Sequence, residues 1–555
     1  MKRILLLFLC LPALNVLAQP ALTENQKLES LSKIWGFLKY YHPEVAKGKR
    51  DWDAELMAKI PQVKKARNQQ ELSKLYDSWV ASLGKVKRCG SCDNNIPDSL
   101  MRNISFGWLQ DASTFTPEFS QKLEYIRQNR NQGRNYYVQR RYKLFKTQAY
   151  FPNEKLYEKL PELPTEEFRL LSLFRYWNII NYFFPYKYAI GESWDNVLTD
   201  MLPKFRNAAT PLEYHMALLE LSNRINDGHN FFYTKYRYEY FGSYHVPFQF
   251  KIVEGKALVT GFYHRNFAAN DGIQLGDVIT RVNGKTIEEA LKPNLKYISG
   301  SNYSYKLSRV QNELFNGHTS TLTVTFEKDG VEQTREIRRY YFARFGYKPD
   351  SASVKGKPWR MLNSEVGYIH MGDLVAKDVN TAMKDVWNAK GIILDLRHYP
   401  KPISHAVAAH LKAERSHYAL MTYPDLTYPG VFRPNYPWKA GNKNKKDYYK
   451  GKVVLLVNEG TMSAGEFATM AQQTAPNVTT IGSQTAGADG NIVYIPLPGG
   501  LKASMSGLGV YYPDGRETQR IGIVPDIEVK PSIQGVREGK DEVLDAAIQF
   551  ITAGK

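Results

Sequence analysis

The stretch from Gly451 to Asp489 constrains the fold of this chain more than any other. It opens with a continuous apolar run, Val453 to Val457, which is typical of a buried strand. A short turn follows, and the residues from Ala464 to Gln473 have a helical pattern. The sequence therefore predicts a buried strand that passes through a sharp turn into a helix.

Ser463 stands where this turn meets the predicted helix. A hydroxyl at such a turn is held clear of the sheet, and the free N–H groups of a helix start can stabilise a developing oxyanion. Both features suit acyl chemistry. The segment also matches a helix capping box, because Glu466 follows the serine at the required spacing. From this segment alone, a nucleophile and a plain helix cap are both open interpretations.

Further motifs resemble the catalytic core of the tail-specific (C-terminal-processing) and tricorn-core serine peptidases. Besides residues 458–466, the resemblance rests on the segment from Ile481 to Gly487. It also rests on Gly522 to Ile527, which looks like the closing signature of that family. The resemblance covers the chain from about His229 to its end, and it implies that Ser463 is the nucleophile of a serine peptidase.

The same resemblance implies where the oxyanion is held. Ala464, directly after the nucleophile, is the expected backbone donor. Relatives form a second donor in an Asn-Pro-Gly-Gly segment, where this chain has His398 to Pro402. Lys401 keeps an N–H in that segment, but Pro402 has none. We therefore expect Ala464 to be the main donor.

The general base separates two branches of the family. Tail-specific proteases use a lysine after a Thr-x-Gly segment, but residues 488–490, which follow Thr485 to Gly487 here, contain no lysine. The tricorn-core branch uses a histidine at a helix end before the PDZ region, and the matching residue is His229. A serine precedes that histidine in the branch, whereas this chain has Gly228. The chain thus resembles the Ser–His branch more closely than the Ser–Lys branch.

The carboxylate that would orient the histidine has two candidates. Glu517 lies near the position where tricorn-like relatives carry a catalytic glutamate, although its spacing to Gly522 differs. Asp489 is the rival. Either residue could instead belong to a turn, and His229 itself could be a helix cap or a surface residue.

Four further histidines do not have the spacing of a known zinc site, and we interpret them as loop and surface residues: His398, His405, His410 and His417. No metal or cofactor is expected.

Residues 24–87 and 166–229 look like two copies of one helical unit. Four anchor pairs in these segments are separated by the same interval of 142 residues: Trp35 and Trp177, Pro43 and Pro185, Trp52 and Trp194, Pro61 and Pro203. Residues 88–160 between them are polar and irregular, with strands possible at 105–108 and 136–142.

The segment from Val246 to Ile337 is predicted to form short strands. Residues 271–287 alternate between apolar and polar and contain the Asn283-Gly284 turn signal. This region resembles a PDZ domain of the kind embedded in the same peptidases. PDZ domains bind an extended peptide as an added strand, often by its C-terminus. A scaffold with a degenerate groove is the open alternative.

Together these features predict a multidomain α+β protein with a duplicated N-terminal helical region, a PDZ-like β-rich domain and an α/β peptidase core of the tail-specific protease (crotonase-like) type. The expected divisions are a signal peptide (1–18), a helical domain with a polar insert (19–160), a second helical repeat ending at His229 (161–240), the PDZ-like domain (241–345) and the peptidase core (346–555).

The N-terminal residues are typical of a secretory signal. Lys2 and Arg3 precede an apolar run, and Val16 to Ala18 resembles a cleavage site. The run is too short to span a membrane. We therefore expect a periplasmic or secreted protein without stable membrane insertion. In an oxidising compartment, Cys89 and Cys92 are expected to form a loop-clamping disulfide, with a redox pair or a metal half-site as alternatives.

The net charge of +19 makes a nucleic-acid partner conceivable. Basic and aromatic residues mix at 134–146 and 338–348, but no zinc-finger spacing or RNA-binding signature accompanies them. A solvated basic surface is the preferred interpretation, and no nucleic-acid partner is expected.

The function predicted from the sequence is an exported serine endopeptidase that cleaves unfolded or extended polypeptides, including C-terminal tails presented by the PDZ-like domain. The alternative is a catalytically inactive peptide- or ligand-binding protein on the same fold. A third hypothesis is a polyanion binder. The sequence does not determine the oligomeric state or the physiological substrate.

Overall fold

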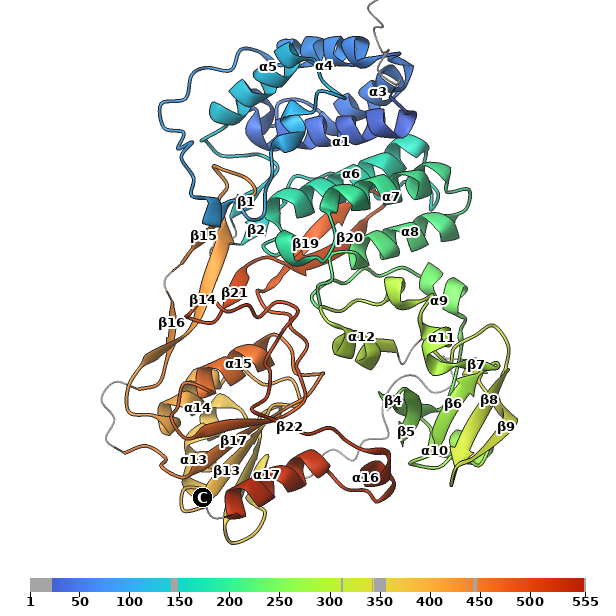
Figure 1. The fold of residues 1–555 in the computed structure, drawn as a ribbon, viewed down its shortest axis with the longest axis vertical. Helices are drawn as coiled ribbons and strands as arrows, with labels where there is room; N and C mark the ends of the chain where they lie inside the picture. Colours follow the sequence, from blue (N-terminus) through green and yellow to red (C-terminus); the bar gives the residue numbers. More distant parts are fainter. Residues whose placement is uncertain are drawn as a thin grey trace, which may run out of the picture.

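The computed structural model describes residues 22–140, 148–310, 313–341, 343, 356–435, 437–442 and 447–553. The predicted signal sequence lies outside this part of the chain. A helical region forms one end of the elongated molecule, and a β-rich domain and an α/β core lie next to each other at the other end (Figure 1).

The helical region contains two sets of helices with matching bounds. α1 (Glu24–Tyr41) and α6 (Glu166–Phe183) are 142 residues apart at both ends, and so are α3 (Trp52–Lys65) and α7 (Trp194–Asn207). This is the interval that separates the sequence anchors. The region also contains α2 (Pro43–Ala46), α4 (Gln69–Leu83), α5 (Pro117–Gln128) and α8 (Pro211–Asn223).

Within each of the two helix sets, the same kind of contact holds two helices together. In the first set, Trp35 and Trp52 each donate an indole N–H to the other's backbone carbonyl, at 2.9 and 3.0 Å. In the second set, Trp177 and Trp194 do the same at 2.7 and 3.0 Å. All four rings are buried. The tryptophans that anchor the sequence repeat therefore fix each helix pair.

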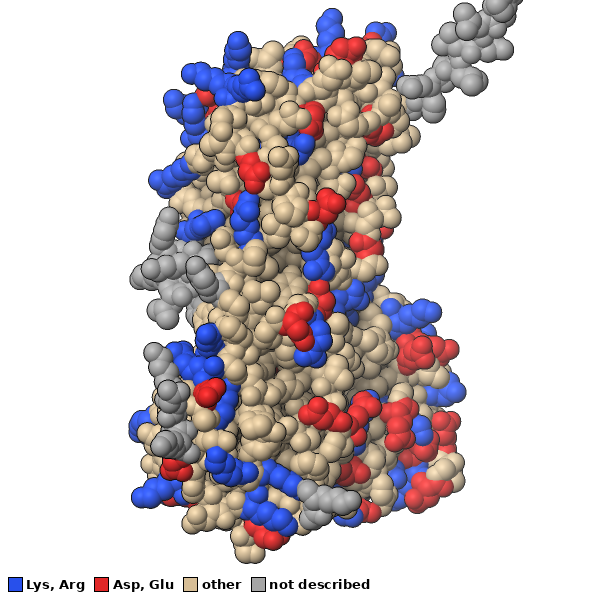
Figure 2. Space-filling view, turned by 60° about the vertical axis from the view of Figure 1, so that its left-hand side comes forward, with Lys and Arg blue, Asp and Glu red and all other residues tan. Residues whose placement is uncertain are grey.

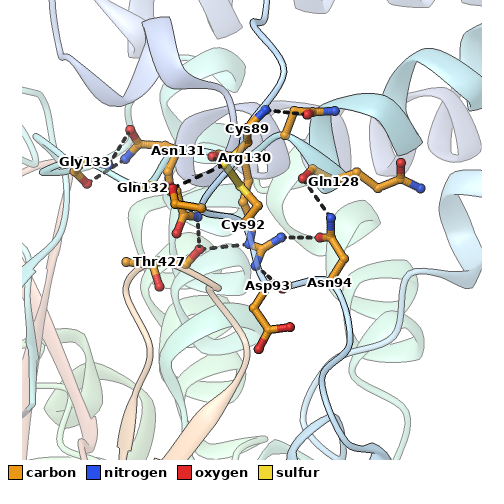
Figure 3. The surroundings of a disulfide bond; sticks show 12 residues. Cys89, Cys92, Asp93, Asn94, Gln128, Arg130, Asn131, Gln132, Gly133 and Thr427 are labelled. Carbon is orange, nitrogen blue, oxygen red and sulfur yellow. Dashed lines mark hydrogen bonds between the residues drawn. A yellow bond between two sulfur atoms is a disulfide. The ribbon is translucent and has the colours of Figure 1, made fainter.

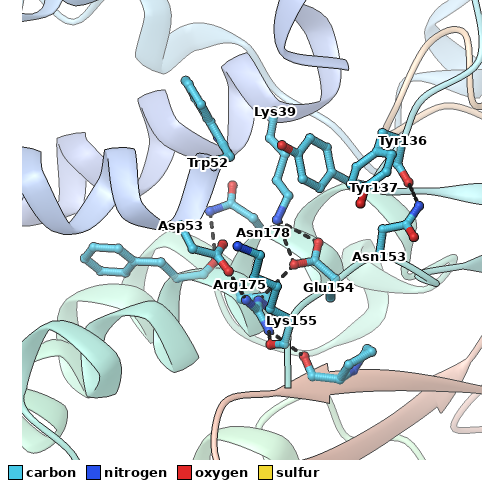
Figure 4. Close-up of polar contacts among 12 residues, drawn as sticks. Lys39, Trp52, Asp53, Tyr136, Tyr137, Asn153, Glu154, Lys155, Arg175 and Asn178 are labelled. Carbon is cyan, nitrogen blue, oxygen red and sulfur yellow. Dashed lines mark hydrogen bonds and ion pairs between the residues drawn. The ribbon is translucent and has the colours of Figure 1, made fainter. Parts of the chain in front are cut away.

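Four charged side chains are buried together where α1, α3 and α6 meet the segment before α6 (Figure 4). The Lys39 ammonium lies 2.6 and 2.9 Å from the two oxygens of Glu154. Arg175 contacts Glu154 at 3.0 Å and Asp53 at 2.6 Å. Two cations therefore balance two carboxylates, as buried charges require.

Glu154→Gln is expected to lower the free energy of unfolding of the helical region by about 3–5 kcal/mol, because the change leaves buried cations incompletely paired. The matched control is Glu158→Gln, at an exposed position four residues later, which is expected to change it by less than about 0.5 kcal/mol. Urea titration followed by circular dichroism measures both. Equal urea midpoints for the two variants would contradict a stabilising role for the buried charge cluster.

The polar insert contains the predicted disulfide and contacts the α/β core. Cys89 and Cys92 are bonded, with their Cα atoms 5.6 Å apart. Next to them, the Arg130 guanidinium donates to the carbonyls of Asp93 at 2.6 Å and Thr427 at 2.9 Å (Figure 3). The disulfide loop is thereby joined to a loop of the core.

The strands expected in the insert are mostly replaced by other structure. The prediction of a strand at 105–108 is wrong, because Gly107–Gln110 form a single 3₁₀ turn. The strand at 136–142 is reduced to β1 (Gln139–Arg140), which pairs with β2 (Ala149–Tyr150). Residues 141 and 142 lie outside the described part of the chain.

The β-rich domain is an antiparallel sheet with strand order β4-β5-β6-β8-β9 and β7 beside β6. The predicted Asn283-Gly284 turn is present, and both residues have positive φ, at 48° and 78°. The strands of the sheet are β4 (Phe248–Val253), β5 (Lys256–Phe262), β6 (Val278–Val282), β7 (Lys285–Thr286), β8 (Thr321–Lys328) and β9 (Val331–Arg338). The neighbouring elements are α9 (Tyr236–Phe241), β3 (Tyr244–His245), α10 (Arg265–Ala269), α11 (Ile287–Leu291), α12 (Tyr303–Arg309) and β10 (Tyr340–Tyr341).

The α/β core is built on a sheet with strand order β11-β12-β13-β17-β18-β22, in which all neighbours are parallel except β11 and β12. Apolar residues of α13, α14 and α15 cover one face, and those of α17 cover the other. The strands are β11 (Trp359–Met361), β12 (Val366–His370), β13 (Gly391–Asp395), β17 (Lys452–Val457), β18 (Val478–Gly482) and β22 (Ile527–Glu528). The helices are α13 (Val379–Asp385), α14 (Ser404–Leu411), α15 (Ala464–Gln472), α16 (Ile533–Arg537) and α17 (Glu542–Thr552).

Two antiparallel units connect this core to the helical region. One is β14 (Ser416–Pro424) with its partners β15 (Phe432–Pro434), β16 (Trp438–Ala440) and β21 (Gly509–Tyr511). The other is the hairpin of β19 (Ile492–Leu497) and β20 (Leu501–Ser506), which lies beneath α6 (Figure 1). Val493, Ile495 and Met505 of the hairpin belong to the hydrophobic core of the helical region.

Charges of both signs are scattered over the face shown in Figure 2. Among the described residues, no helix is both long and apolar enough to cross a membrane.

Candidate active site

Ser463 lies at the junction between β17 and α15 in a strained backbone conformation. The predicted strand and helix are both present, and the serine is the residue just before the helix. Its φ and ψ are 52° and −111°, whereas a helix N-cap residue normally has an extended backbone. A non-glycine residue in such a region costs about 1–3 kcal/mol and persists only where its surroundings impose it. A sharp strand-to-helix turn of this kind is how nucleophilic serines are presented above a sheet.

Glu466 imposes much of this conformation. The Ser463 N–H donates to a Glu466 carboxylate oxygen at 3.1 Å, so the capping box is present, and also to the Ala488 carbonyl at 3.1 Å. The same carboxylate accepts from Thr485 Oγ1 at 2.5 Å and from the N–H groups of Gly487 and Ala488 at 2.7 and 3.0 Å. Burial raises the pKa of the Glu466 carboxyl, and these donors oppose the shift. The helix cap and the nucleophile turn are therefore one structure.

His229 is buried, with 5% of its surface exposed, and its ring is held through a serine by a carboxylate. His229 Nδ1 lies 2.9 Å from Ser506 Oγ, which lies 3.0 Å from Asp227 Oδ1. Since a carboxylate only accepts hydrogen bonds, the Ser506 hydroxyl donates to Asp227 and accepts from the imidazole. Nδ1 then carries the proton, and Nε2 is left with the lone pair that a general base needs.

Asp227 is fixed by the backbone around it. The Ser506 N–H donates to its Oδ2 at 2.5 Å, and the His229 N–H donates to its Oδ1 at 3.0 Å. The side chain is 1% exposed. Burial lowers the pKa of His229, and the Asp227 charge opposes that shift.

The prediction that His229 ends a helix is wrong. α8 stops at Asn223, and the histidine lies six residues later in a turn. Asn226 within that turn has a positive φ of 47°, which a continuing helix does not allow.

The serine and histidine segments meet at Ala488. A Cβ added to Gly228 would lie 2.8 Å from the Ala488 Cβ. Ala488 is also the residue whose carbonyl accepts from the Ser463 N–H. The absence of a side chain at Gly228 therefore lets the histidine turn approach the loop that contains Ala488.

A segment next to α12 bridges the two halves of the site. Ser301 Oγ accepts from the Gly228 N–H at 2.7 Å, on the histidine side. Asn302 Nδ2 donates to the Thr485 carbonyl at 2.7 Å, on the serine side. Neither residue was expected from the sequence. Asp227 has a sequence signal, since it lies two residues before the candidate base, but Ser506 is 277 residues away and has none.

The two carboxylates expected to orient His229 lie in other surroundings. Glu517 accepts from Arg102 Nη2 at 2.7 Å and from the Tyr188 hydroxyl at 2.6 Å. Asp489 is 2% exposed, and its Oδ2 has no hydrogen-bond partner among the described residues. Burial and the charge of Glu466 raise the pKa of Asp489 well above its usual range. The structure places neither of them on the His229 Nδ1.

Backbone donors stand at the start of α15. Ala464 is the first residue of this helix, so its N–H has no acceptor within the helix. The segment from His398 to Pro402 runs alongside, because a Cβ added to Gly465 would lie 3.6 Å from Pro400 Cδ. In the described part of the chain, no three His, Cys, Asp or Glu side chains are arranged to hold a metal ion.

A strained serine at the strand-to-helix turn of a mostly parallel sheet, together with a buried and oriented histidine whose turn contacts the loop at Ala488, is typical of serine hydrolases. Residues 365–529 match the model of Peptidase family S41, and the chain therefore carries a peptidase domain of that family.

Relatives of known identity agree with this assignment. The chain is 25% identical over 287 residues to a carboxy-terminal-processing protease of Bartonella bacilliformis, in a match that covers 50% of this chain and 59% of that protein, less than two thirds of its length. Two structures of mature CPAF, one of them in complex with lactacystin, are each 14% identical and superpose with TM-scores of 0.54 and 0.53. Each match covers 70% of this chain and 99% of CPAF, and at this identity it shows a shared fold.

Proposed function

We propose that the protein is an exported serine endopeptidase with a Ser–His mechanism, which cleaves unfolded or extended polypeptides. The observation that carries the proposal is the buried chain from His229 through Ser506 to Asp227, whose histidine turn contacts the loop that holds Ser463. A protein that only binds peptides has no need for an imidazole oriented in this way or for a strained serine.

The residues have distinct roles in the proposed reaction. His229 Nε2 takes the proton from the Ser463 hydroxyl as its oxygen attacks the scissile carbonyl. The Ala464 N–H donates to the oxyanion that forms. His229 then gives the proton to the departing amine, and the acyl group leaves Ser463 when a water molecule is activated in the same way.

Asp227 and Ser506 are the proposed orienting pair, in place of Glu517 or Asp489. They hold the proton on Nδ1 and stabilise the imidazolium that forms during each transfer. The missing lysine after Thr485 to Gly487 supports the Ser–His branch of the family over the Ser–Lys branch.

Two regions outside the core are assigned by inference. We infer that the helical region is duplicated, which the matching helix bounds and tryptophan contacts support. We also infer that residues 241–345 are a PDZ-like module that presents a peptide or a C-terminal tail. The secretory pattern of residues 1–18 supports export to the periplasm or beyond.

A second candidate is an inactive binding protein on the same fold. The segment from His398 to Pro402, which differs from the Asn-Pro-Gly-Gly of relatives, favours it, since a proline there removes a backbone donor.

A fluorophosphonate probe distinguishes the two candidates, because it reacts only with an activated serine. We expect stoichiometric labelling of a peptide that contains Ser463, identified by mass spectrometry, together with cleavage of unfolded casein in the presence of a chelator. A folded protein that neither reacts with the probe nor cleaves casein would contradict the peptidase proposal and favour the hypothesis of an inactive binding protein.

A further inference from the structure

A cavity lies between the insert and the β19–β20 hairpin. It has a volume of about 730 Å³, within the range of ligand-binding sites. Tyr150, Phe151 and Pro152 form one wall, and Tyr494, Pro496 and Lys502 of the hairpin form the other. Because aromatic and proline side chains dominate both walls, the cavity suits apolar side chains.

The hairpin wall adjoins the turn that carries His229. Tyr494 pairs directly with Ser504 across the hairpin, and Ile492 pairs with Ser506. Paired residues share one face of a sheet and lie about 5 Å apart. Ser504 Oγ donates to the His229 carbonyl at 2.8 Å. Tyr494, which lines the cavity, is therefore the cross-strand neighbour of Ser504, and Ser504 binds the backbone of the proposed base.

Exposed apolar residues also lie on the hairpin and just after the histidine turn. The Phe231 backbone N–H donates to Ser504 Oγ at 2.8 Å, and its ring is 58% exposed. Tyr494 is also 58% exposed, and Ile492 is 43% exposed. Large apolar groups that cluster at the surface mark binding sites. Each of the three therefore adjoins Ser504 or Ser506, the two serines that contact the histidine turn, through a backbone hydrogen bond or a cross-strand pair.

We propose that this cavity and the adjoining side chains form a groove for an apolar segment of the polypeptide substrate, in extended form and rich in aromatic or large aliphatic side chains. The inference rests on the proposed function, because its occupant is the substrate of Ser463. Its position next to the His229 turn favours the substrate over a second copy of the chain. The groove gives the enzyme a contact with unfolded polypeptides that is separate from the PDZ-like domain.

The test measures binding apart from cleavage. In a Ser463→Ala background, fluorescein-labelled unfolded casein is titrated and its anisotropy gives Kd. Tyr494→Ala is expected to raise Kd at least tenfold, because it removes a rigid apolar anchor. The matched control is Tyr125→Ala, a tyrosine of α5 that is 43% exposed and lies outside both the cavity and the PDZ-like region, which is expected to change Kd by less than twofold. Circular dichroism and thermal melting verify that each variant folds.

Tyr150→Ala, on the opposite wall, provides a second variant should Tyr494→Ala fail to fold, and it is expected to raise Kd in the same way. Equal Kd values for the groove variants and the control would overturn the proposal. A dimer seen by sedimentation velocity that Tyr494→Ala dissociates would also overturn it, since the groove would then be an interface between copies. Groove-dependent binding without cleavage by the wild-type protein would support the groove and refute only the peptidase proposal.

Discussion

Ser463→Ala and His229→Ala are each expected to reduce the cleavage rate of unfolded casein by a factor on the order of 10⁴–10⁶, while the proteins remain folded. The hydroxyl and the imidazole act in the same step, so either loss removes the covalent route. The double variant is expected to be no slower than the single variants, because residues that act as a unit are not additive. Initial rates of fluorescent peptide release measure all three.

Matched controls separate chemistry from stability. Ser78→Ala changes an exposed serine in α4, and His417→Ala changes an exposed histidine in β14, and both are expected to keep wild-type rates. Rates for His229→Ala close to those of the wild type would mean that another group is the base. Full activity of Ser463→Ala would remove the nucleophile assignment altogether.

The local elements of the core could be predicted because their signals lie within short windows. The apolar run from Val453 to Val457 became β17, which extends one residue further at its start. The helical pattern from Ala464 to Gln473 became α15, which ends one residue earlier. These segments are buried on one or both faces, so their apolar spacing directly records the period of the strand or helix.

The candidate site was only half visible in the sequence, because its contacts join distant segments. Ser463 and His229 stand in recognisable motifs, but the group on His229 Nδ1 comes from β20. A serine in an alternating strand has no local pattern that shows whether it faces solvent or, as Ser506 does, a buried partner. The expectation for Glu517 rested on spacing to a family motif, and spacing does not encode where a loop side chain points.

The environment of Ser463 shows why two interpretations of one motif were both reasonable. Ser463 and Glu466 do form a capping box, but Glu466 also binds the loop that contains Ala488. A short-range sequence rule predicts the contact between Ser463 and Glu466, but it cannot predict the contact of Glu466 with Ala488. The strained φ of the serine depends on both, and so the cap and the nucleophile are not exclusive alternatives.

Asp227→Asn and Ser506→Ala are expected to reduce kcat by a factor on the order of 10²–10⁴ with little change in KM, since both changes disturb the tautomer of His229 and remove no apolar side chain of the proposed groove. Asn at position 227 no longer stabilises the imidazolium, and Ala at position 506 removes the acceptor of the Nδ1 proton. Glu517→Gln is the comparison, and it is expected to alter kcat by less than threefold. A large loss in Glu517→Gln with normal kcat in Asp227→Asn would restore the glutamate as the orienting group.

The pH profile gives a readout that a merely structural role would not move. The reaction needs neutral His229, and burial lowers its pKa below the usual value near 6.5, so the acid limb of kcat/KM for the wild type should have its midpoint below pH 6.5. The Asp227 charge raises this pKa against the effect of burial. Its removal in Asp227→Asn therefore lowers the pKa further, and the acid limb should move to lower pH while the plateau falls. Loss of activity through misfolding lowers the plateau without this shift, and an acid limb that moves to higher pH would contradict the contact between Asp227 and the base.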